Sequence, residues 1–398
     1  MAIELLVNGV LYGGWTSVSI SRSIGTAAGA FNIECTENVG GEAIHWPIRP
    51  NDECEVRVAG QVVIKGYIDK TTLDVSDSSH SIAVDGRDKT GDLVDCAAAV
   101  KQWRNVSILD LAKELCAPFS IEVVLETEPG KPLAVFKTEP GETVFKALER
   151  AAKIAGILLV QARGALVLTH AGAQQAATPL VLGGNIKSGT ADYDYSERFS
   201  EYTITGQRAG KDNDHGKAAA HVRSAVKDEA IKRHRPFAKS ADGQATPEMA
   251  RRQAEWEKQV REAKSTQLSC TVAGWTQHNG QLWDINQRAQ VEAATLAVQG
   301  ELLISAVEYG YDDSGEITKI ELIRPEALLP SPEAAEKANR NTAAKPARGK
   351  GRSGDKGRSG GKRGRQGKGQ NAVSGDVLVI KPDAQGNYKP GNFERGKS

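Results

Sequence analysis

The chain has 398 residues, of which 39% are hydrophobic and 25% are charged, and such a chain buries a sizeable core and divides into two or three domains. Residues 345–369 contain ten Lys or Arg and one Asp, so subtracting about +9 from the formal net charge of +1 leaves about −8 elsewhere. No apolar run approaches the roughly 18 residues that cross a bilayer. The N-terminus, MAIELLVNGVLYGGW, lacks a signal peptide's basic region and cleavage site, so we expect cytoplasmic synthesis without classical export.

The sequence predicts a mainly β fold with an α+β insert. We expect two small β-barrel domains, a duplicated helix-strand α/β domain between them, and a disordered basic C-terminal tail. The predicted boundaries are 1–98 for the N-terminal barrel, 99–175 for the α/β domain, 176–330 for the second barrel with a helical insert at about 211–264, and 331–398 for the tail.

Residues 1–98 are rich in short, β-branched, roughly alternating segments. Gly, Asn, Asp or Ser stand at the joins, as is typical of a small antiparallel barrel or sandwich. A single sheet with this alternation exposes its apolar face, whereas closure into a barrel hides that face and removes free edges. The segments are FNIEC, ECEVRVAG, QVVIKGYID, TTLDVSD and HSIAVDGRD.

From about residue 99 the apolar period changes from two to nearly four. Ser107 is predicted to cap one helix, with Asp110 at the capping-box position, and Thr143 to cap a second helix that ends at Gly156. Strands SIEVVL and ILLVQA follow the two helices, and the Arg163–Gly164 pair turns the chain into ALVLTH. Both units align at one offset of 36 residues, which indicates a duplication; the alternative is two ordinary amphipathic helices that happen to match.

The second β region begins with EYTITGQ and resumes at STQLSCTVAGW. Between them, Thr246 and Pro247 are predicted to start a polar helix. Its predicted apolar stripe consists of Met249, Gln253, Trp256 and Val260.

Two hairpins and a proline-rich end complete the folded part. Asn279 and Gly280 are a strong hairpin signal between Trp275 and Trp283. ELLISAVEYGY and EITKIELIRP are predicted to pair across DDSG, before Pro325, Pro330 and Pro332 end the fold. The Gly- and Lys/Arg-rich tail has almost no apolar residues and cannot offset the entropy of ordering.

Motifs for catalysis or cofactor binding are not found in the sequence. The stretch GKDNDHGKA, residues 210–218, is a near miss for a phosphate-binding loop, because its glycines are one residue too far apart and Ala218 replaces the Ser or Thr that holds magnesium. A turn into the helical insert explains it equally well. His215 and His221 are six residues apart and would lie on different helical faces. We therefore expect no enzyme, cofactor or metal site, although a carboxylate pair converging from distant positions stays open.

The five cysteines also bear on chemistry. They are odd in number and include no CxxC pair, which favours buried reduced thiols over disulfides or zinc. They are Cys35, Cys54, Cys96, Cys116 and Cys270.

The basic tail has two interpretations. Its Lys and Arg residues would bind phosphates in a salt-dependent manner, but residues 345–369 contain no aromatic side chain on which bases stack. An unstructured linker or an electrostatic tether to an acidic partner fits equally well, and the stretch SGDVLVIKPDAQGNYKPGNF could dock as a short β element. Nucleic acid is therefore not the expected partner.

The order of segments resembles the baseplate hub proteins of contractile-tailed phages, in particular the Mu-like tail protein P group. The resemblance covers roughly residues 1–330. It rests on SILDLAKELCAPFSIEV, ETVFKALERAAKIAGILLV, EYTITGQ, IKRHRPF, ARRQAEWEKQVREAKS and ELLISAVEYGYDDSGEITKIELIRPEAL, and above all on CTVAGWTQHNGQLWDINQRAQVE, with its GW, NG, LW and N between Gly274 and Asn286.

The resemblance implies a structural, non-catalytic part of the virion tail baseplate, assembled in the host cytoplasm. Family members form a homotrimeric ring whose two related barrels per subunit present six similar barrels. That ring matches the sixfold tail tube on one side and the trimeric spike protein on the other, with other baseplate proteins and the tape measure as further partners. The ring requires a large obligate interface, typically roughly 2,000 Å² or more.

Candidate partner-binding residues fall in three places. Trp275 and Trp283 either fill the second barrel's core and brace its hairpin, or anchor the tube or spike. Arg233 and Arg235, beside Pro236, form either a contact loop or a solvated edge of the insert. In the tail the candidates are Arg352, Arg358, Arg363 and Arg365.

Two competing functions remain at this stage. One is a nucleic-acid-binding protein led by the basic tail, for which loss of residues 345–369 would abolish function. The other is a hub with cell-wall hydrolase activity, for which little globular sequence remains after Pro332. The sequence does not separate an infectious phage from a domesticated prophage or a contractile bacteriocin.

Overall fold

A computed structural model of the chain describes residues 3–36, 48–76, 80–207, 221–244, 246–312 and 315–332, together with the pairs 379–380 and 393–394. The chain divides into two compact units, residues 1–344 and 345–398. In the second unit, β23 (Val379–Ile380) pairs antiparallel with β24 (Phe393–Glu394). All other elements described below belong to the first unit.

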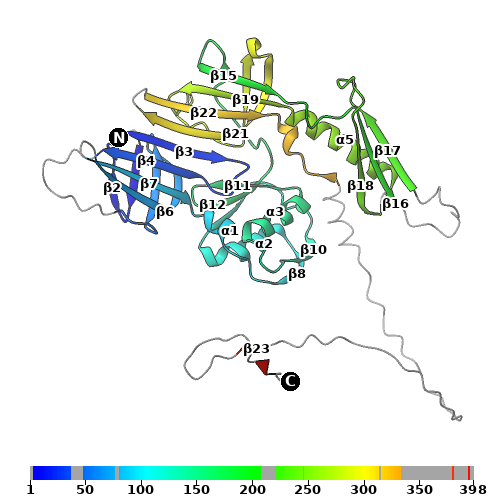
Figure 1. Cartoon of the computed structure of the whole chain (residues 1–398), viewed down its shortest axis with the longest axis horizontal. Helices are drawn as coiled ribbons and strands as arrows, with labels where there is room; N and C mark the ends of the chain where they lie inside the picture. Colours follow the sequence, from blue (N-terminus) through cyan, green and yellow to red (C-terminus); the bar gives the residue numbers. More distant parts are fainter. Residues whose placement is uncertain are drawn as a thin grey trace. The chain divides into compact units, whose positions relative to one another are not determined.

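One 14-stranded sheet dominates the first unit, with the order β15-β19-β22-β21-β3-β4-β7-β6-β5-β1-β2 and with β20, β13 and β14 branching from β21 (Figure 1). Its first half contains β1 (Ile3–Val7), β2 (Val10–Tyr12), β3 (Ser17–Ser23), β4 (Ala30–Thr36), β5 (Glu53–Val58), β6 (Gln61–Val75) and β7 (His80–Asp88). Its second half contains β13 (Gln174–Gln175), β14 (Leu180–Val181), β15 (Ile186–Tyr193), β19 (Thr266–Ala273), β20 (Gln287–Ala293), β21 (Val298–Asp312) and β22 (Gly315–Ile323), with the short 3₁₀ helix η2 (Ala294–Leu296) between β20 and β21.

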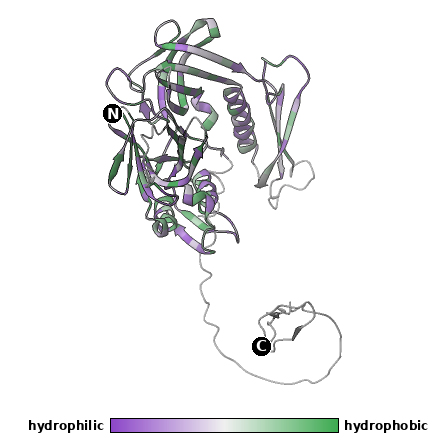
Figure 2. Ribbon diagram, turned by 60° about the vertical axis from the view of Figure 1, so that its left-hand side comes forward, coloured by the Kyte–Doolittle hydropathy of each residue, from purple (hydrophilic) through white to green (hydrophobic). Residues whose placement is uncertain are grey.

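The two halves are joined by a ladder between β21 and β3. It runs antiparallel from Ala306 opposite Ser23 to Tyr311 opposite Val18. Alternating residues of both halves enter one hydrophobic core, because the period of two puts every second side chain on the same face, and Figure 2 shows hydrophobic and hydrophilic residues interspersed along the strands.

The predicted barrels do not close as separate ladders in the described strands. The strand order runs from β15 to β2 without returning to its start. β3 pairs with β4 on one edge and with β21 on the other, so β3 has no free edge with which to close a barrel of the first half. The prediction of a mainly β chain is confirmed.

The region between the halves contains three helices and two small sheets. These elements are α1 (Gly91–Asp95), β8 (Gln102–Val106), α2 (Ile108–Cys116), η1 (Ala117–Phe119), β9 (Glu122–Leu125), β10 (Leu133–Lys137), α3 (Val144–Ala155), β11 (Leu158–Ala162) and β12 (Ala165–Thr169). β10 pairs with β8, and β12 lies between β11 and β9. The strand after α2 is β9 and the strand after α3 is β11, and these two are the outer strands of one sheet. That the two helix-strand units arose by duplication stays a prediction.

The predicted helix ends in this region are confirmed. The Ser107 hydroxyl accepts from the Asp110 N–H at 3.0 Å, and the Thr143 hydroxyl accepts from the Lys146 N–H. Gly156 ends α3 in the left-handed conformation, which glycine adopts without steric cost. Arg163 and Gly164 both have positive φ and form the turn between β11 and β12.

The region predicted as a helical insert differs from the prediction. EYTITGQ forms β16 (Glu201–Gln207), which does not join the large sheet; it is the centre of a separate sheet with β17 (His221–Lys227) antiparallel and β18 (Pro236–Gln244) parallel to it. Helix α5 (Pro247–Lys264) packs on this sheet through a small core of its own. EYTITGQ was correctly predicted as a strand from its residue types. Its pairing partners were not predictable in this way, because tertiary packing decides which strands pair.

The start of α5 was predicted correctly, and its buried face was predicted in part. Thr246 caps the helix and Pro247 is its first residue. The helix is largely hydrophilic (Figure 2), and Met249 and Trp256 are only half-buried. Gln253 and Val260 of the predicted stripe are buried, together with residues that were not predicted, namely Ala250, Ala254, Glu257 and Ala263. The 3₁₀ helix η3 (Pro325–Leu328) packs against α5.

Candidate functional site

The two predicted tryptophans lie together inside the second half of the large sheet. Trp275 is 3% exposed and Trp283 is 2% exposed. The Trp283 N–H donates to the Trp275 carbonyl at 3.2 Å, the Trp275 indole N–H donates to the Gly310 carbonyl at 2.9 Å, and the Tyr309 hydroxyl donates to the Trp283 carbonyl. Both rings therefore belong to the core and brace the hairpin.

The turn that these tryptophans support is the predicted one. Gly280 has a φ of +81°, and its N–H donates to the Gln277 carbonyl at 3.0 Å. Because neither tryptophan ring is accessible, the surface available to a partner here is the exposed turn at residues 278–281.

Arg233 and Arg235 have different surroundings. Arg233 is exposed. Arg235 is half-buried: its Nη2 donates to the Ser196 carbonyl at 2.6 Å, its N–H donates to the Ser200 hydroxyl at 2.9 Å, and its guanidinium lies 5.1 Å from the centre of the Phe199 ring. Arg235 thus fixes the segment leading into β16, and Arg233 is the one of the two that a partner can reach.

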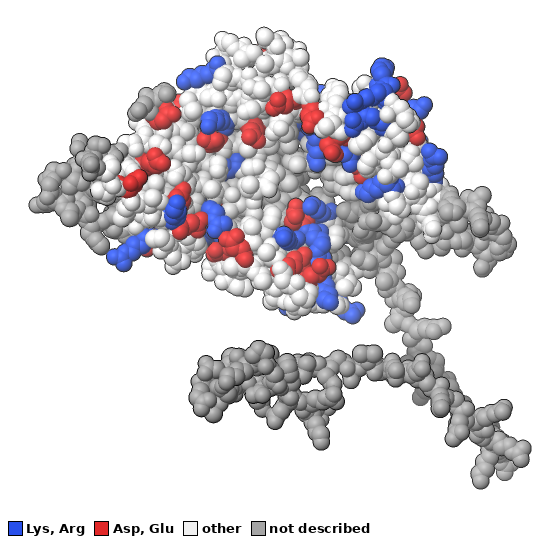
Figure 3. Space-filling model, viewed as in Figure 1, with Lys and Arg blue, Asp and Glu red and all other residues white. Residues whose placement is uncertain are grey.

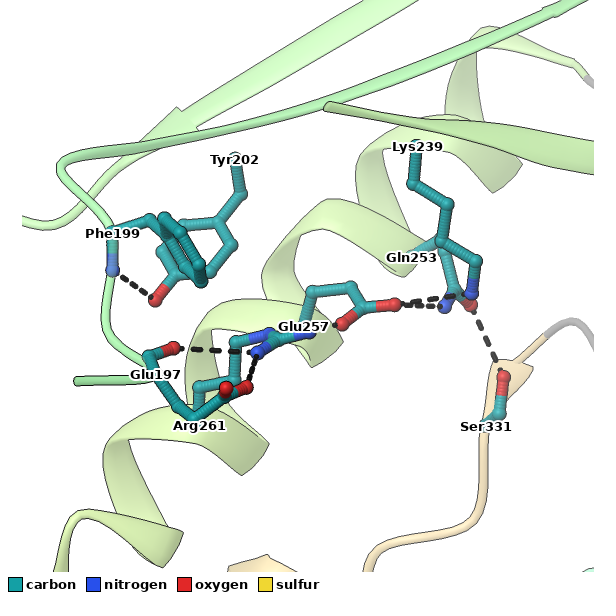
Figure 4. Close-up of polar contacts among 8 residues, drawn as sticks. All are labelled: Glu197, Phe199, Tyr202, Lys239, Gln253, Glu257, Arg261 and Ser331. Carbon is teal, nitrogen blue, oxygen red and sulfur yellow. Dashed lines mark hydrogen bonds and ion pairs between the residues drawn. The ribbon is translucent and has the colours of Figure 1, made fainter. Parts of the chain in front are cut away.

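A polar cluster surrounds the buried carboxylate of Glu257 on α5 (Figure 4). Glu257 accepts from Lys239 Nζ of β18 at 3.1 Å, from Gln253 Nε2 at 3.3 Å and from Arg261 Nε at 3.3 Å. Three donors offset the cost of burying one carboxylate. The cluster therefore adds polar contacts to the small apolar core that attaches α5 to its sheet.

The same cluster holds two connecting segments. Arg261 Nη1 pairs with Glu197 Oε2 at 2.6 Å, just before β16, and the Ser331 hydroxyl donates to Gln253 Oε1 at 3.3 Å (Figure 4). The Trp256 indole N–H donates to the Leu329 carbonyl at 3.0 Å. The segment after η3 is thus attached to α5 through side chains that were predicted to form an apolar stripe.

A buried polar junction, which sequence reasoning missed, connects distant parts of the first unit. Arg22 on β3 is 4% exposed and contacts Gln161 on β11 and Asp284 before β20. Burial alone would lower the pKa of Arg22, but Asp284 raises it, so the guanidinium stays charged. The sequence did carry one signal: in SVSISRS, Arg22 occupies the inward position that Val18 and Ile20 occupy before it.

The thiols differ in their exposure. Burial raises the pKa of Cys54, Cys116 and Cys270 to about 12 each, so these three are unreactive at neutral pH. Cys35 is half-buried and Cys96 is exposed. The prediction of buried thiols is therefore right for three positions and wrong for Cys96, which follows the short helix α1 at the surface.

Among the described residues, no group of three or more His, Cys, Asp or Glu side chains could hold a metal ion, and no described helix is long and apolar enough to cross a membrane. A surface hollow of about 510 Å³ is lined in part by Arg87, Asp69 and Asp92. Arg87 pairs with Asp69 at 2.6 Å and with Asp95 at 2.8 Å, so the guanidinium that lines this hollow is already paired.

Charge is unevenly distributed over the face shown in Figure 3. Lys and Arg gather over the small sheet of β16, β17 and β18 and its helix α5, while acidic and basic side chains are mixed over the rest of that face. The phosphate-loop near miss at 210–218, with His215, lies outside the described residues, as do Arg352, Arg358, Arg363 and Arg365, and the side chain of His221 is not described.

Four family models match parts of the chain between residues 2 and 331. They are the N-terminal domain of the Mu phage baseplate assembly protein GpP-like family (residues 2–88), the second domain of the baseplate hub protein gp44-like family (90–170), the third domain of the tail protein NMB1110-like family (198–259) and the fourth domain of GpP (246–331). The baseplate hub protein gp44 of Escherichia phage Mu is 34% identical over 339 residues, which cover 82% of this chain and 89% of gp44. The chain belongs to the Mu-type baseplate hub family.

Two solved structures of phage-type tail proteins are similar to this chain in both sequence and fold. The 43 kDa tail protein of prophage MuSo2 from Shewanella oneidensis is 34% identical and superposes with a TM-score of 0.74, over 82% of this chain and 98% of that one. The tail protein from Neisseria meningitidis MC58 is 25% identical with a TM-score of 0.70, over 84% of this chain and 98% of that one. The chain is therefore a structural component of the virion tail baseplate and not an enzyme, as the resemblance of its segments predicted.

Proposed function

We propose that three copies of the chain form a ring at the centre of the baseplate and join the tail tube to the spike. The observation that carries this proposal is the ladder between β21 and β3, considered together with family membership. It joins two β-rich halves in one sheet within each subunit, so a homotrimer would present six such halves to a sixfold tube and three subunits to a trimeric spike.

Within this ring, we assign the domains as 1–98, 99–175 and 176–330. The exposed Arg233 and the turn braced by Trp275 and Trp283 are the proposed contacts with spike or tube. The remaining candidates, Arg352, Arg358, Arg363 and Arg365, are proposed to act as an accessory tether, because the matching family models extend only from residue 2 to residue 331.

The test is the absolute mass of the full chain, measured by light scattering after size exclusion at low and high salt, with and without the cognate spike protein. We expect a trimer that is insensitive to salt, or a monomer that becomes a trimer when the spike is added. The matched control replaces the four tail arginines with Gln and should assemble equally well. A strict monomer that ignores the spike, combined with tight DNA binding by the full chain, would refute the ring and favour a nucleic-acid-binding function led by the basic tail.

A further inference from the structure

Arg22 makes three hydrogen bonds to residues that are far away in the sequence. Its Nε donates to Gln161 Oε1 at 3.3 Å, its Nη2 donates to the Gln161 carbonyl at 2.8 Å, and its Nη1 pairs with Asp284 Oδ1. The planar guanidinium presents its donors in a fixed fork. These contacts therefore fix the direction of each partner as well as its distance, and we refer to Arg22, Gln161 and Asp284 as the Arg22 junction.

A second contact lies three residues beyond Gln161. The Gly164 N–H, in the turn between β11 and β12, donates at 2.8 Å to Asp88 Oδ2, and Asp88 is 2% exposed at the end of β7. The Thr90 hydroxyl donates to the other oxygen of Asp88 at 2.9 Å. A Cβ at position 164 would lie 3.0 Å from Cβ of Lys65, so this turn approaches the first half of the sheet closely.

The Arg22 junction includes a residue of the ladder that joins the two halves of the large sheet, because Arg22 lies opposite Val307 in that ladder. Among the described strands, the ladder between β21 and β3 is the connection between the two halves. A pair of strands can twist and bend about its own axis. Asp284 belongs to the second half and Arg22 to the first, so their ion pair restrains this bending. Arg22 also contacts Gln161 on β11, so the α/β region is held by the same guanidinium.

We propose that the Arg22 junction fixes the orientation of the first half and the α/β region relative to the second half. Without it, the chain bends about the β21–β3 ladder while each half stays folded. This inference concerns the single subunit and does not depend on the proposed ring.

The test measures the distance between the halves. In a Cys35→Ser, Cys96→Ser background, Lys70→Cys in the first half and Glu292→Cys in the second half, both exposed, carry spin labels for double electron–electron resonance. The parent chain should give a narrow distance distribution. Arg22→Met should broaden it at least about twofold, with far-UV circular dichroism unchanged.

Two further variants make the result decisive. Arg288→Met breaks an exposed ion pair between Arg288 and Glu301 (3.2 Å), and its distribution should stay as narrow as the parent's. Asp284→Asn keeps the shape and removes the charge, so its distribution should be of intermediate width. The inference is overturned if Arg22→Met and Asp284→Asn fold and keep the parent distribution, or if neither folds, because the proposal requires that the halves fold without the junction.

Discussion

Replacing Gly66 with Ala tests how closely the central strands of the first half are packed. Gly66 lies on β6, opposite Cys54 on β5 and Asp88 on β7. A Cβ at this position would lie 1.8 Å from the Arg87 carbonyl oxygen and 2.7 Å from the carbonyl carbon, whereas real Cβ contacts below 3.0 Å essentially never occur. The backbone of β7 must therefore move away from β6.

The size of the effect follows from that displacement. Raising the contact from 1.8 Å to at least 3.0 Å requires a shift of at least 1.2 Å, which takes ladder hydrogen bonds of about 2.9 Å beyond bonding distance. Each lost bond costs about 1 kcal/mol, and overpacking costs about 1–3 kcal/mol more. We expect Gly66→Ala to lower the free energy of unfolding by about 2–4 kcal/mol.

Urea denaturation of the full chain, followed by far-UV circular dichroism, measures this loss as a lower transition midpoint. The matched control is Gly25→Ala, whose Cβ would lie 3.6 Å from the Ser23 hydroxyl, an ordinary contact. Its free energy of unfolding should change by less than about 1 kcal/mol. Equal midpoints for Gly66→Ala and Gly25→Ala would mean that β6 and β7 accommodate the extra methyl group without being displaced.

Two further predictions concern buried polar contacts. Tyr309→Phe removes the hydroxyl that donates to the Trp283 carbonyl and should cost about 1–3 kcal/mol in the same urea assay; an unchanged midpoint would mean that the carbonyl finds another donor. Burial raises the pKa of Glu142, but Arg150 and the Glu139 N–H outweigh burial and lower the pKa overall. The ionised carboxylate therefore stabilises the fold above its unfolded pKa of about 4.3. This stabilisation is lost as the pH falls through the folded pKa. Glu142→Gln should therefore destabilise the chain most near pH 7, and a difference from the parent that does not shrink below about pH 4 would contradict the assignment.

Local features were predictable from the sequence because each depends on a few neighbouring residues. Ser107, Thr143 and Thr246 cap helices as expected, since a capping hydroxyl bonds an N–H three residues ahead. Gly280 forms the expected turn, because its positive φ suits glycine. The order of such segments was also sufficient to indicate the hub family.

The buried face of α5 was not predictable in the same way. An amphipathic pattern identifies apolar side chains, whereas this helix is attached by the carboxylate of Glu257, with Lys239 and Arg261 as donors. The contact with Lys239 joins two elements, so the helix sequence does not reveal it. Gln253, Glu257 and Arg261, by contrast, are spaced four residues apart on α5, and the sequence does show that spacing.

The amino-acid sequence was sufficient to predict the strand-rich composition, the helix ends, the turns and the membership of a non-catalytic structural family, because these depend on local propensity and on the order of segments. Tertiary structure alone decided that EYTITGQ leaves the large sheet, that β21 pairs with β3, and that Trp275 and Trp283 are buried. The same holds for Arg22, whose partners are 139 and 262 residues away. Strand pairing and burial are set by the packing of the whole chain, since any strand offers the same backbone donors and acceptors to every potential neighbour.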